Sequence, residues 1–160
     1  MTRILFVCMG NICRSPTAEA VMTRLVADAG LAGELEIESA GTGGWHVGNA
    51  PDARATAAAN VRGFAMQSVA QQVSARDFDR FDLLIAMDRD NVGNLQRLAL
   101  DAEAAAKVRL LREFDPASAG APDLDVPDPY YGGDDGFEHV LDLVEAACAG
   151  LLDELRRARA

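Results

Sequence analysis

Apolar and polar residues follow one another along this chain in blocks that predict strands alternating with helices. Arg3–Val7 is a short, almost wholly apolar run, which is typical of a parallel strand buried on both faces. Leu35–Gly41 alternates like a second strand, and the apolar runs Phe81–Asp88 and Lys107–Phe114 predict a third and a fourth. From Gly136 onward the apolar residues keep helical spacing and predict one long amphipathic helix.

Helices are also predicted between the strands. The first follows Ser15, which suits an N-cap with Pro16 at the first helical position, and Gly30 ends it. A second helix is predicted over residues 52–64, closed by a glycine, and a third from about Asp88 to Leu100.

This order of elements predicts a three-layer α/β domain, with about four parallel strands flanked by helices and joined by right-handed crossovers. No internal repeat or second domain is visible, so we expect residues 1–160 to form a single domain. Ligands of such sheets bind beyond the carboxyl ends of the strands, where Cys8 is expected. The proline- and glycine-rich stretch Asp115–Gly136 is predicted to be irregular, as functional or disordered loops are.

Composition and charge narrow the classes of function. The 160 residues are 49% hydrophobic and carry a net charge of −10, which argues against a nucleic-acid or membrane partner. The sequence has no run of about 18 apolar residues, and the apolar stretch within "MTRILFV" is too short for a secretory signal, so we expect neither a membrane span nor such a signal. Three cysteines do not form a disulfide framework. We therefore expect a reducing, cytoplasmic setting.

The segment "CMGNICRS" after the first strand carries the strongest chemical signal, and we call Cys8–Ser15 the phosphate loop. Backbone N–H groups at a helix N-terminus bind anions, and Arg14 adds a planar cation that matches two phosphate oxygens. Gly10 permits a tight path, and Asn11 tolerates a positive φ. The same field favours the thiolate of Cys8, to which Ser15 could donate a hydrogen bond, and this thiolate is set for in-line attack on phosphorus.

Two other interpretations of this loop are weaker. A nucleotide-phosphate loop would end in Gly-Lys-Ser/Thr, which is absent. A metal site built on Cys8 and Cys13 lacks further ligands, because the chain has two histidines and no second cysteine pair. We therefore expect neither a metal nor a cofactor.

The stretch "VCMGNICRSPTAEA" resembles the signature of the low-molecular-weight protein tyrosine phosphatases. The resemblance continues in the same order through "SAGTGGWHVGN", "MDRDN" and "DPYYGGDDGFE", over nearly the whole chain. It implies a flavodoxin-like sheet with strand order 2-1-3-4, Cys8 as nucleophile and Arg14 as the phosphate-binding arginine. The residues that it implies around the phosphate are Met9, Gly10, Asn11, Ile12, Cys13 and Ser15.

The general acid is the next question, because the leaving oxygen must be protonated. Asp128 lies between Pro127 and Pro129, and the local sequence allows either a simple turn or a catalytic carboxyl. The resemblance implies the catalytic role. His46 and His139 are expected at the surface.

Aromatic residues in loops indicate the substrate pocket. By resemblance, Trp45, Tyr130 and Tyr131 wall a crevice suited to a phenyl ring, although Trp45 could also pack against a helix. Phosphoarginine phosphatases resemble this family but place a threonine at Ile12 and lack the tyrosine pair. Arsenate reductases of the fold need later resolving cysteines, and Cys148 is expected in the core.

Several residues have roles that the sequence leaves open. The resemblance implies that Ser39 supports the phosphate loop, but relatives often carry histidine at Ser68 and arginine at Gln71. Cys13 could protect the nucleophile as a disulfide or simply pack behind the loop. Asp88 could approach the site or cap the following helix.

The sequence therefore predicts a metal-independent phosphotyrosine phosphatase that forms a phosphocysteine intermediate. Its expected partners are tyrosine-phosphorylated proteins, with inorganic phosphate or other oxyanions as product or inhibitor. The alternatives are a phosphoarginine phosphatase or arsenate reductase of the same fold, or a non-catalytic module that binds phosphosites.

Overall fold

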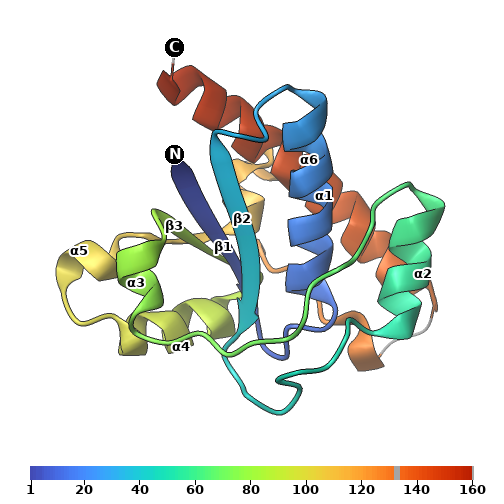
Figure 1. Cartoon of the computed structure of the whole chain (residues 1–160), viewed down its shortest axis with the longest axis horizontal. Helices are drawn as coiled ribbons and strands as arrows, with labels where there is room; N and C mark the ends of the chain where they lie inside the picture. Colours follow the sequence, from blue (N-terminus) through green and yellow to red (C-terminus); the bar gives the residue numbers. More distant parts are fainter. Residues whose placement is uncertain (132–133, 160) are drawn as a thin grey trace.

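Four parallel strands form one sheet in the computed structural model, which describes residues 1–131 and 134–159, without the side chains of Tyr131 and Asp134. The strands lie in the order β2-β1-β3-β4, as predicted (Figure 1). Their bounds are β1 Thr2–Cys8, β2 Leu35–Gly41, β3 Leu83–Ala86 and β4 Val108–Leu110. The predicted fold class is therefore confirmed.

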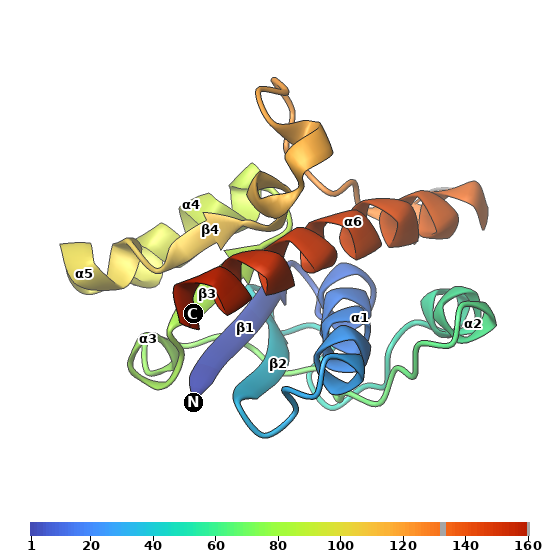
Figure 2. The same cartoon turned by 90° about the horizontal axis from the view of Figure 1, so that it is seen from above.

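Helices cover both faces of this sheet, as Figure 2 shows from above. One face carries α1 (Arg14–Asp28), α2 (Ala53–Val61) and α6 (Asp134–Arg159), and the other carries α3 (Asp77–Arg80), α4 (Arg89–Leu98) and α5 (Ala102–Ala105). The short helices α3 and α5 were not predicted. Within the described residues, no helix has the length and apolar composition needed to cross a membrane.

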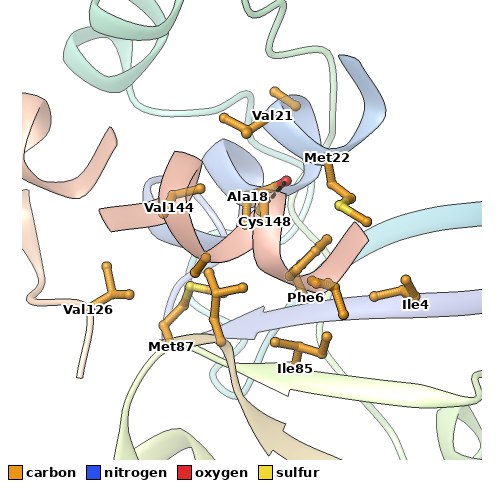
Figure 3. Packing of buried hydrophobic residues seen from close by; sticks show 14 of the residues in the cluster. Ile4, Phe6, Ala18, Val21, Met22, Ile85, Met87, Val126, Val144 and Cys148 are labelled. Carbon is orange, nitrogen blue, oxygen red and sulfur yellow. Dashed lines mark hydrogen bonds between the residues drawn. The ribbon is translucent and has the colours of Figure 1, made fainter. Parts of the chain in front are cut away.

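The core is split by the sheet because successive side chains of β1 point to opposite faces. Ile4 and Phe6 pack with α1 and α6, where they meet Cys148 (Figure 3). Leu5 and Val7 pack with the apolar residues of the α3 and α4 face. Cys148 is fully buried, as expected, and burial raises the pKa of its thiol.

The predicted fourth strand over residues 107–114 is too long. Only Val108–Leu110 pairs with β3, and Leu111–Phe114 forms the 3₁₀ helix η1. Leu111 and Phe114 are buried in the cluster that contains α6, so packing against that helix explains the apolar run. Two further 3₁₀ turns, η2 (Pro116–Ser118) and η3 (Pro129–Tyr131), lie in the stretch predicted to be irregular.

The predicted Ser15 cap is also wrong. Helix α1 begins at Arg14, and its N-cap is Cys13, whose side chain makes no capping hydrogen bond. The Ser15 hydroxyl instead lies 3.0 Å from Cys8 Sγ and 2.8 Å from Asn11 Nδ2. These bonds to the phosphate loop replace the bond that a cap would make. The predicted stop at Gly30 is confirmed, since this residue has φ +74°.

Candidate active site

The phosphate loop connects the end of β1 to the start of α1, and Cys8 is the last residue of that strand. Asn11 has φ 56°, so the left-handed conformation expected there is present. This conformation directs the Asn11 N–H to Cys8 Sγ at 3.3 Å. The Ser15 oxygen lies 3.0 Å from the same sulfur. Cys8 is 3% exposed, so two polar groups face a buried sulfur.

Arg14 is buried beside the sulfur, with 3% of its side chain exposed. Its Nη1 donates to Asp88 Oδ2 at 2.6 Å and to the Val126 carbonyl at 3.0 Å. Its Nη2 lies 3.7 Å from Asp128 Oδ2. Burial lowers the pKa of Arg14, but Cys8 and the two carboxylates outweigh it, so the pKa is raised. The guanidinium therefore remains charged while it is held from several sides.

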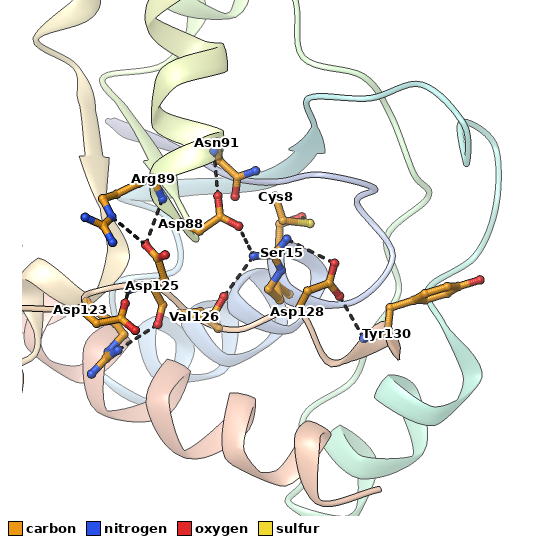
Figure 4. A network of polar contacts seen from close by, with 12 residues as sticks. Cys8, Ser15, Asp88, Arg89, Asn91, Asp123, Asp125, Val126, Asp128 and Tyr130 are labelled. Atoms are coloured by element: carbon orange, nitrogen blue, oxygen red, sulfur yellow. Dashed lines mark hydrogen bonds and ion pairs between the residues drawn. The ribbon is translucent and has the colours of Figure 1, made fainter. Parts of the chain in front are cut away.

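Asp88 performs both of the roles that the sequence left open. Its Oδ1 accepts a hydrogen bond from Asn91 N at 2.7 Å and caps α4, while its Oδ2 accepts from Arg14. Figure 4 shows the Asp88 carboxylate between Asn91 and the centre of the site. One side chain thus connects the start of a helix to the buried arginine.

The two carboxylate oxygens of Asp128 likewise contact different partners. Oδ1 accepts from Tyr130 N at 3.0 Å, which is the local turn that the dipeptide suggested, and Oδ2 faces Arg14 (Figure 4). Its side chain is 28% exposed. The preceding segment is held to the end of β3, because Val126 N donates to the Met87 carbonyl at 2.7 Å. The carboxyl group therefore lies at the site and remains open to a ligand.

A pocket of about 400 Å³ lies over these groups. It is lined by Cys8, Met9, Gly10, Ile12, Cys13, Arg14, Trp45, His46, Asp128 and Tyr130. It therefore brings together the nucleophile, arginine and acid that the sequence predicted, with two of the three predicted aromatic residues. The side chain of Tyr131 lies outside the part of the chain that the structure describes.

The pocket wall contains Trp45, which was predicted there, and His46, which was not. Trp45 is 73% exposed, so it stands at the pocket mouth and not packed into the core. His46 was expected at the surface, but it lines the pocket, with its ring 6.5 Å from the Tyr130 ring. Its position next to Trp45 in the chain was the available signal.

Asn11 joins the phosphate loop to its surroundings. Its Nδ2 donates to Ser15 Oγ at 2.8 Å and to Ser39 Oγ at 3.0 Å, and its Oδ1 accepts from Gln71 N at 3.0 Å. The structure thus places Ser39 beside the loop. Ser68 is not in this set of bonds, and within the described residues its buried Oγ has no hydrogen-bond partner.

Cys13 packs behind the loop, in a small cluster with Ala55 and Phe137. Burial, followed by the charge of Asp52, raises the pKa of its thiol to about 12. All three cysteines of the chain are free. The thiol of Cys13 is therefore held in the protonated form at neutral pH.

This chain is similar to known phosphatases over nearly its whole length. A family model described as "Low molecular weight phosphotyrosine protein phosphatase" matches residues 3–160. A low molecular weight protein-tyrosine-phosphatase of Streptomyces coelicolor is 54% identical over 154 residues, covering 96% of this chain and 93% of that protein.

Solved structures extend this similarity. A protein tyrosine phosphatase from Entamoeba histolytica with Hepes in the active site superposes with TM-score 0.92 at 36% identity, covering 100% of both chains. A Drosophila arginine phosphatase superposes with TM-score 0.88 at 32% identity, covering 97% of this chain and 98% of that one.

Proposed function

Since the chain belongs to the low molecular weight phosphotyrosine protein phosphatase family, we propose that Cys8, Arg14 and Asp128 carry out the hydrolysis of phosphotyrosine. Membership makes the protein a hydrolase whose ligands are phosphoproteins and phosphate. The roles of the individual residues are our proposal, and they follow from the geometry of the pocket.

In the first step, Cys8 Sγ attacks phosphorus and the bond from phosphorus to the tyrosine oxygen breaks. Asp128, protonated at the start, gives its proton to that oxygen, and a phosphocysteine remains. In the second step, the Asp128 carboxylate takes a proton from water. This water attacks phosphorus, the sulfur–phosphorus bond breaks, and phosphate leaves with Cys8 again a thiolate.

Charge on the transferring group is stabilised in both steps by Arg14 and by the backbone N–H groups of the phosphate loop. The observation that carries the proposal is the position of Cys8 Sγ. It lines one pocket with Arg14 and Asp128, and it faces the Asn11 N–H and the Ser15 hydroxyl. Donors of this kind stabilise a thiolate, the nucleophilic form of cysteine.

The pocket lining and the position of Cys148 argue against the two alternative reactions, phosphoarginine hydrolysis and arsenate reduction. Ile12, Trp45 and Tyr130 present apolar and aromatic surface at its wall, which favours a phenyl ring over a guanidinium group. Arsenate reduction requires a later cysteine that reaches the nucleophile. Cys148 is fully buried in the core beside α1, and its Sγ contacts the Ala18 carbonyl at 3.9 Å, so it does not supply that function.

We place the reaction in the cytoplasm, because the proposed nucleophile must remain a reduced thiol and all three cysteines are free. Detection of the protein in cytoplasmic fractions tests this placement. Tyrosine-phosphorylated proteins are the proposed substrates, with phosphate as the product.

The proposed reaction is tested with matched peptides that carry phosphotyrosine, phosphoserine or phosphoarginine. We expect metal-free release of phosphate from phosphotyrosine, no release by Cys8→Ser, and severely reduced turnover by Asp128→Asn with phosphate affinity retained. Preference for phosphoarginine would overturn the substrate assignment. Binding of phosphopeptides without turnover by the wild-type protein would overturn catalysis altogether.

A further inference from the structure

We propose that Arg112 is a positioning residue for the general acid, and that its guanidinium fixes the segment from which Asp128 projects. This inference rests on the proposed function, since it requires Asp128 to protonate the leaving oxygen. Arg112 lies in η1 and does not line the pocket, so it reaches the reaction through the backbone that leads to Asp128.

The loop between η2 and η3 returns to the sheet at Asp125 and Val126. Val126 is fully buried, its N–H donates to the Met87 carbonyl at 2.7 Å, and its own carbonyl accepts from Arg14 at 3.0 Å. Figure 4 shows Val126 on the path from Asp125 to Asp128. The position of the Asp128 carboxyl therefore depends on how firmly the returning backbone is held.

Arg112 joins the start of this loop to its return. Its Nη1 donates to the Asp125 carbonyl at 2.9 Å, and its Nη2 donates to Ser118 Oγ at 3.3 Å. Ser118 is 6% exposed, and its hydroxyl donates to Asp115 Oδ2 at 2.9 Å. Because the serine hydrogen is committed to that carboxylate, the serine oxygen is left to accept from Arg112. One guanidinium thus bridges two points of the loop.

Within the described residues, two arginines connect Asp125 to other elements. The backbone N–H of Arg89, at the start of α4, donates to Asp125 Oδ1 at 3.0 Å, and the Arg89 Nε lies 3.8 Å from the same oxygen (Figure 4). The side chain of Arg89 is 71% exposed, so water screens its charge. The Arg89 contacts hold a rotatable carboxylate, whereas the Arg112 bond holds the main chain itself. Arg112 is therefore the stronger constraint on the path of the backbone.

Two prolines transmit a displacement of Asp125 to Asp128. The ring of Pro127 fixes its φ near about −65°, and Pro129 restricts the backbone of Asp128. The Asp128 carboxyl is fixed to the same segment, because its Oδ1 accepts from Tyr130 N at 3.0 Å. The segment therefore moves as a stiff unit, and a shift at its base becomes a shift of the carboxyl.

A displaced acid slows the first step to an extent that depends on the leaving group. The basic oxygen of phenol needs a proton as its bond to phosphorus breaks, whereas the more acidic p-nitrophenol leaves readily without one. The phosphate site itself is held separately, since Arg14 retains its 2.6 Å bond to Asp88. Loss of Arg112 should therefore affect phenyl phosphate more than p-nitrophenyl phosphate and leave phosphate affinity unchanged.

The test is Arg112→Met, which keeps the apolar part of the side chain and removes its donors. The readout is kcat/KM on the two substrates, because this parameter reports the first chemical step. A hydrogen bond to a charged group shifts an equilibrium by about 10- to 100-fold, and the two bonds of Val126 remain. We expect kcat/KM to fall about 10-fold on phenyl phosphate and less than about 3-fold on p-nitrophenyl phosphate. Inhibition by inorganic phosphate should be unchanged.

Arg89→Ala is the matched control, since it removes an exposed arginine beside the same aspartate and keeps the backbone bond. Its kcat/KM values should equal those of the wild type. If Arg112 were merely structural, the melting temperature of Arg112→Met would fall while the ratio of the two substrates stayed constant. If Arg112 acted as a distant positive charge, phosphate inhibition would weaken in both variants. Either result overturns the proposal.

Asp128→Asn separates this inference from the proposed function. In that background Arg112→Met should no longer change the ratio of the two substrates, because no acid remains to be displaced; a further change in the ratio would refute the inference. If Asp128→Asn alone leaves the wild-type ratio, the proposed acid is refuted and this inference falls with it. If Asp128→Asn changes the ratio and Arg112→Met does not, the inference alone is refuted.

A second variant keeps the test decisive if Arg112→Met does not fold. Arg112→Gln has a polar side chain that is too short to reach the Asp125 carbonyl, so we expect the same selective loss on phenyl phosphate. A folded Arg112→Gln protein with the wild-type ratio of the two substrates would refute the proposal.

Discussion

The end of β2 approaches the phosphate loop so closely that Gly41→Ala becomes a direct test of how the loop is held. A Cβ at this position would lie 2.7 Å from the Met9 carbonyl oxygen and 3.2 Å from Asn11 N, both of them backbone atoms. Reaching an ordinary contact of 3.4 Å requires a displacement of about 0.7 Å from the Met9 oxygen. The strand end cannot easily yield, because Gly41 N donates to the Gln71 carbonyl and Gly41 O accepts from Val73 N, both at 2.8 Å.

The loop must therefore move, and the movement affects stability and catalysis differently. Overfilling a packed site of this kind costs about 1–3 kcal/mol of unfolding free energy. Because a misplacement of about 1 Å in reacting groups costs about 100-fold in rate, we expect kcat/KM to fall roughly 10- to 100-fold. The affinity for inorganic phosphate should weaken as well, since the displaced atoms belong to the phosphate loop.

The assay is kcat/KM on p-nitrophenyl phosphate, together with phosphate inhibition and urea denaturation. Gly33→Ala is the matched control, because a Cβ there would lie more than 4 Å from every atom of the described residues other than Gly33 itself and its two chain neighbours. It should leave kcat/KM unchanged and alter the unfolding free energy by less than about 1 kcal/mol. A folded Gly41→Ala protein with wild-type kcat/KM and phosphate affinity would refute the reasoning.

Three further predictions concern a cap, a helix contact and a thiol. Asp88→Asn keeps an oxygen to cap α4 but loses the charge that faces the site arginine, so we expect KM to rise and stability to fall by about 1–3 kcal/mol in calorimetry; an unchanged KM contradicts this. Gly150→Ala places a Cβ 1.8 Å from the Phe114 carbonyl oxygen, so denaturant titration should show a loss of stability, although the same change in an open helix stabilises by about 1 kcal/mol. A stabilised variant would rule this out. Because burial raises the pKa of Cys13 to about 12, that thiol stays protonated below this pH. Limiting iodoacetamide at pH about 7 should therefore modify Cys8 first by peptide mass spectrometry, and equal labelling would count against the assignment.

The strands that hold the site were predictable because they are long and distinctly patterned. β1 is apolar and buried from Ile4 to Cys8, where both of its faces are covered, and the observed bounds of β2 match the alternating run Leu35–Gly41. The strand predicted over Lys107–Phe114 was too long, and the reason is physical. An apolar run reports burial, and it does not distinguish an edge strand from a 3₁₀ turn packed on a helix.

In the site as well, contacts within one short segment were predictable, whereas contacts between segments far apart in the sequence were not. Cys8, Arg14 and Ser15 lie within one loop, so their spacing alone suggested their proximity. For Ser15 the sequence allowed two bonds, a helix cap and a bond to the Cys8 sulfur, and the structure has the second and not the first, because only the fold decides whether a hydroxyl near a helix start turns inward. The contact between His46 and Tyr130 has no signal in the sequence, since the two residues belong to segments far apart in the chain.

The hydrogen bond between Arg14 and the Val126 carbonyl has a consequence for synthesis of the protein. The two residues are 112 positions apart, so a ribosome produces the cysteine and arginine early and their remaining partners late. A domain generally folds as a unit, so it is completed only when its C-terminal segments have been made. Until the segment around Val126 has emerged, the arginine lacks this bond, and the proposed general acid, Asp128, has not yet been made. A nascent or truncated chain would thus carry the thiol without the hydrolytic activity, which would first appear when nearly the whole domain has been translated.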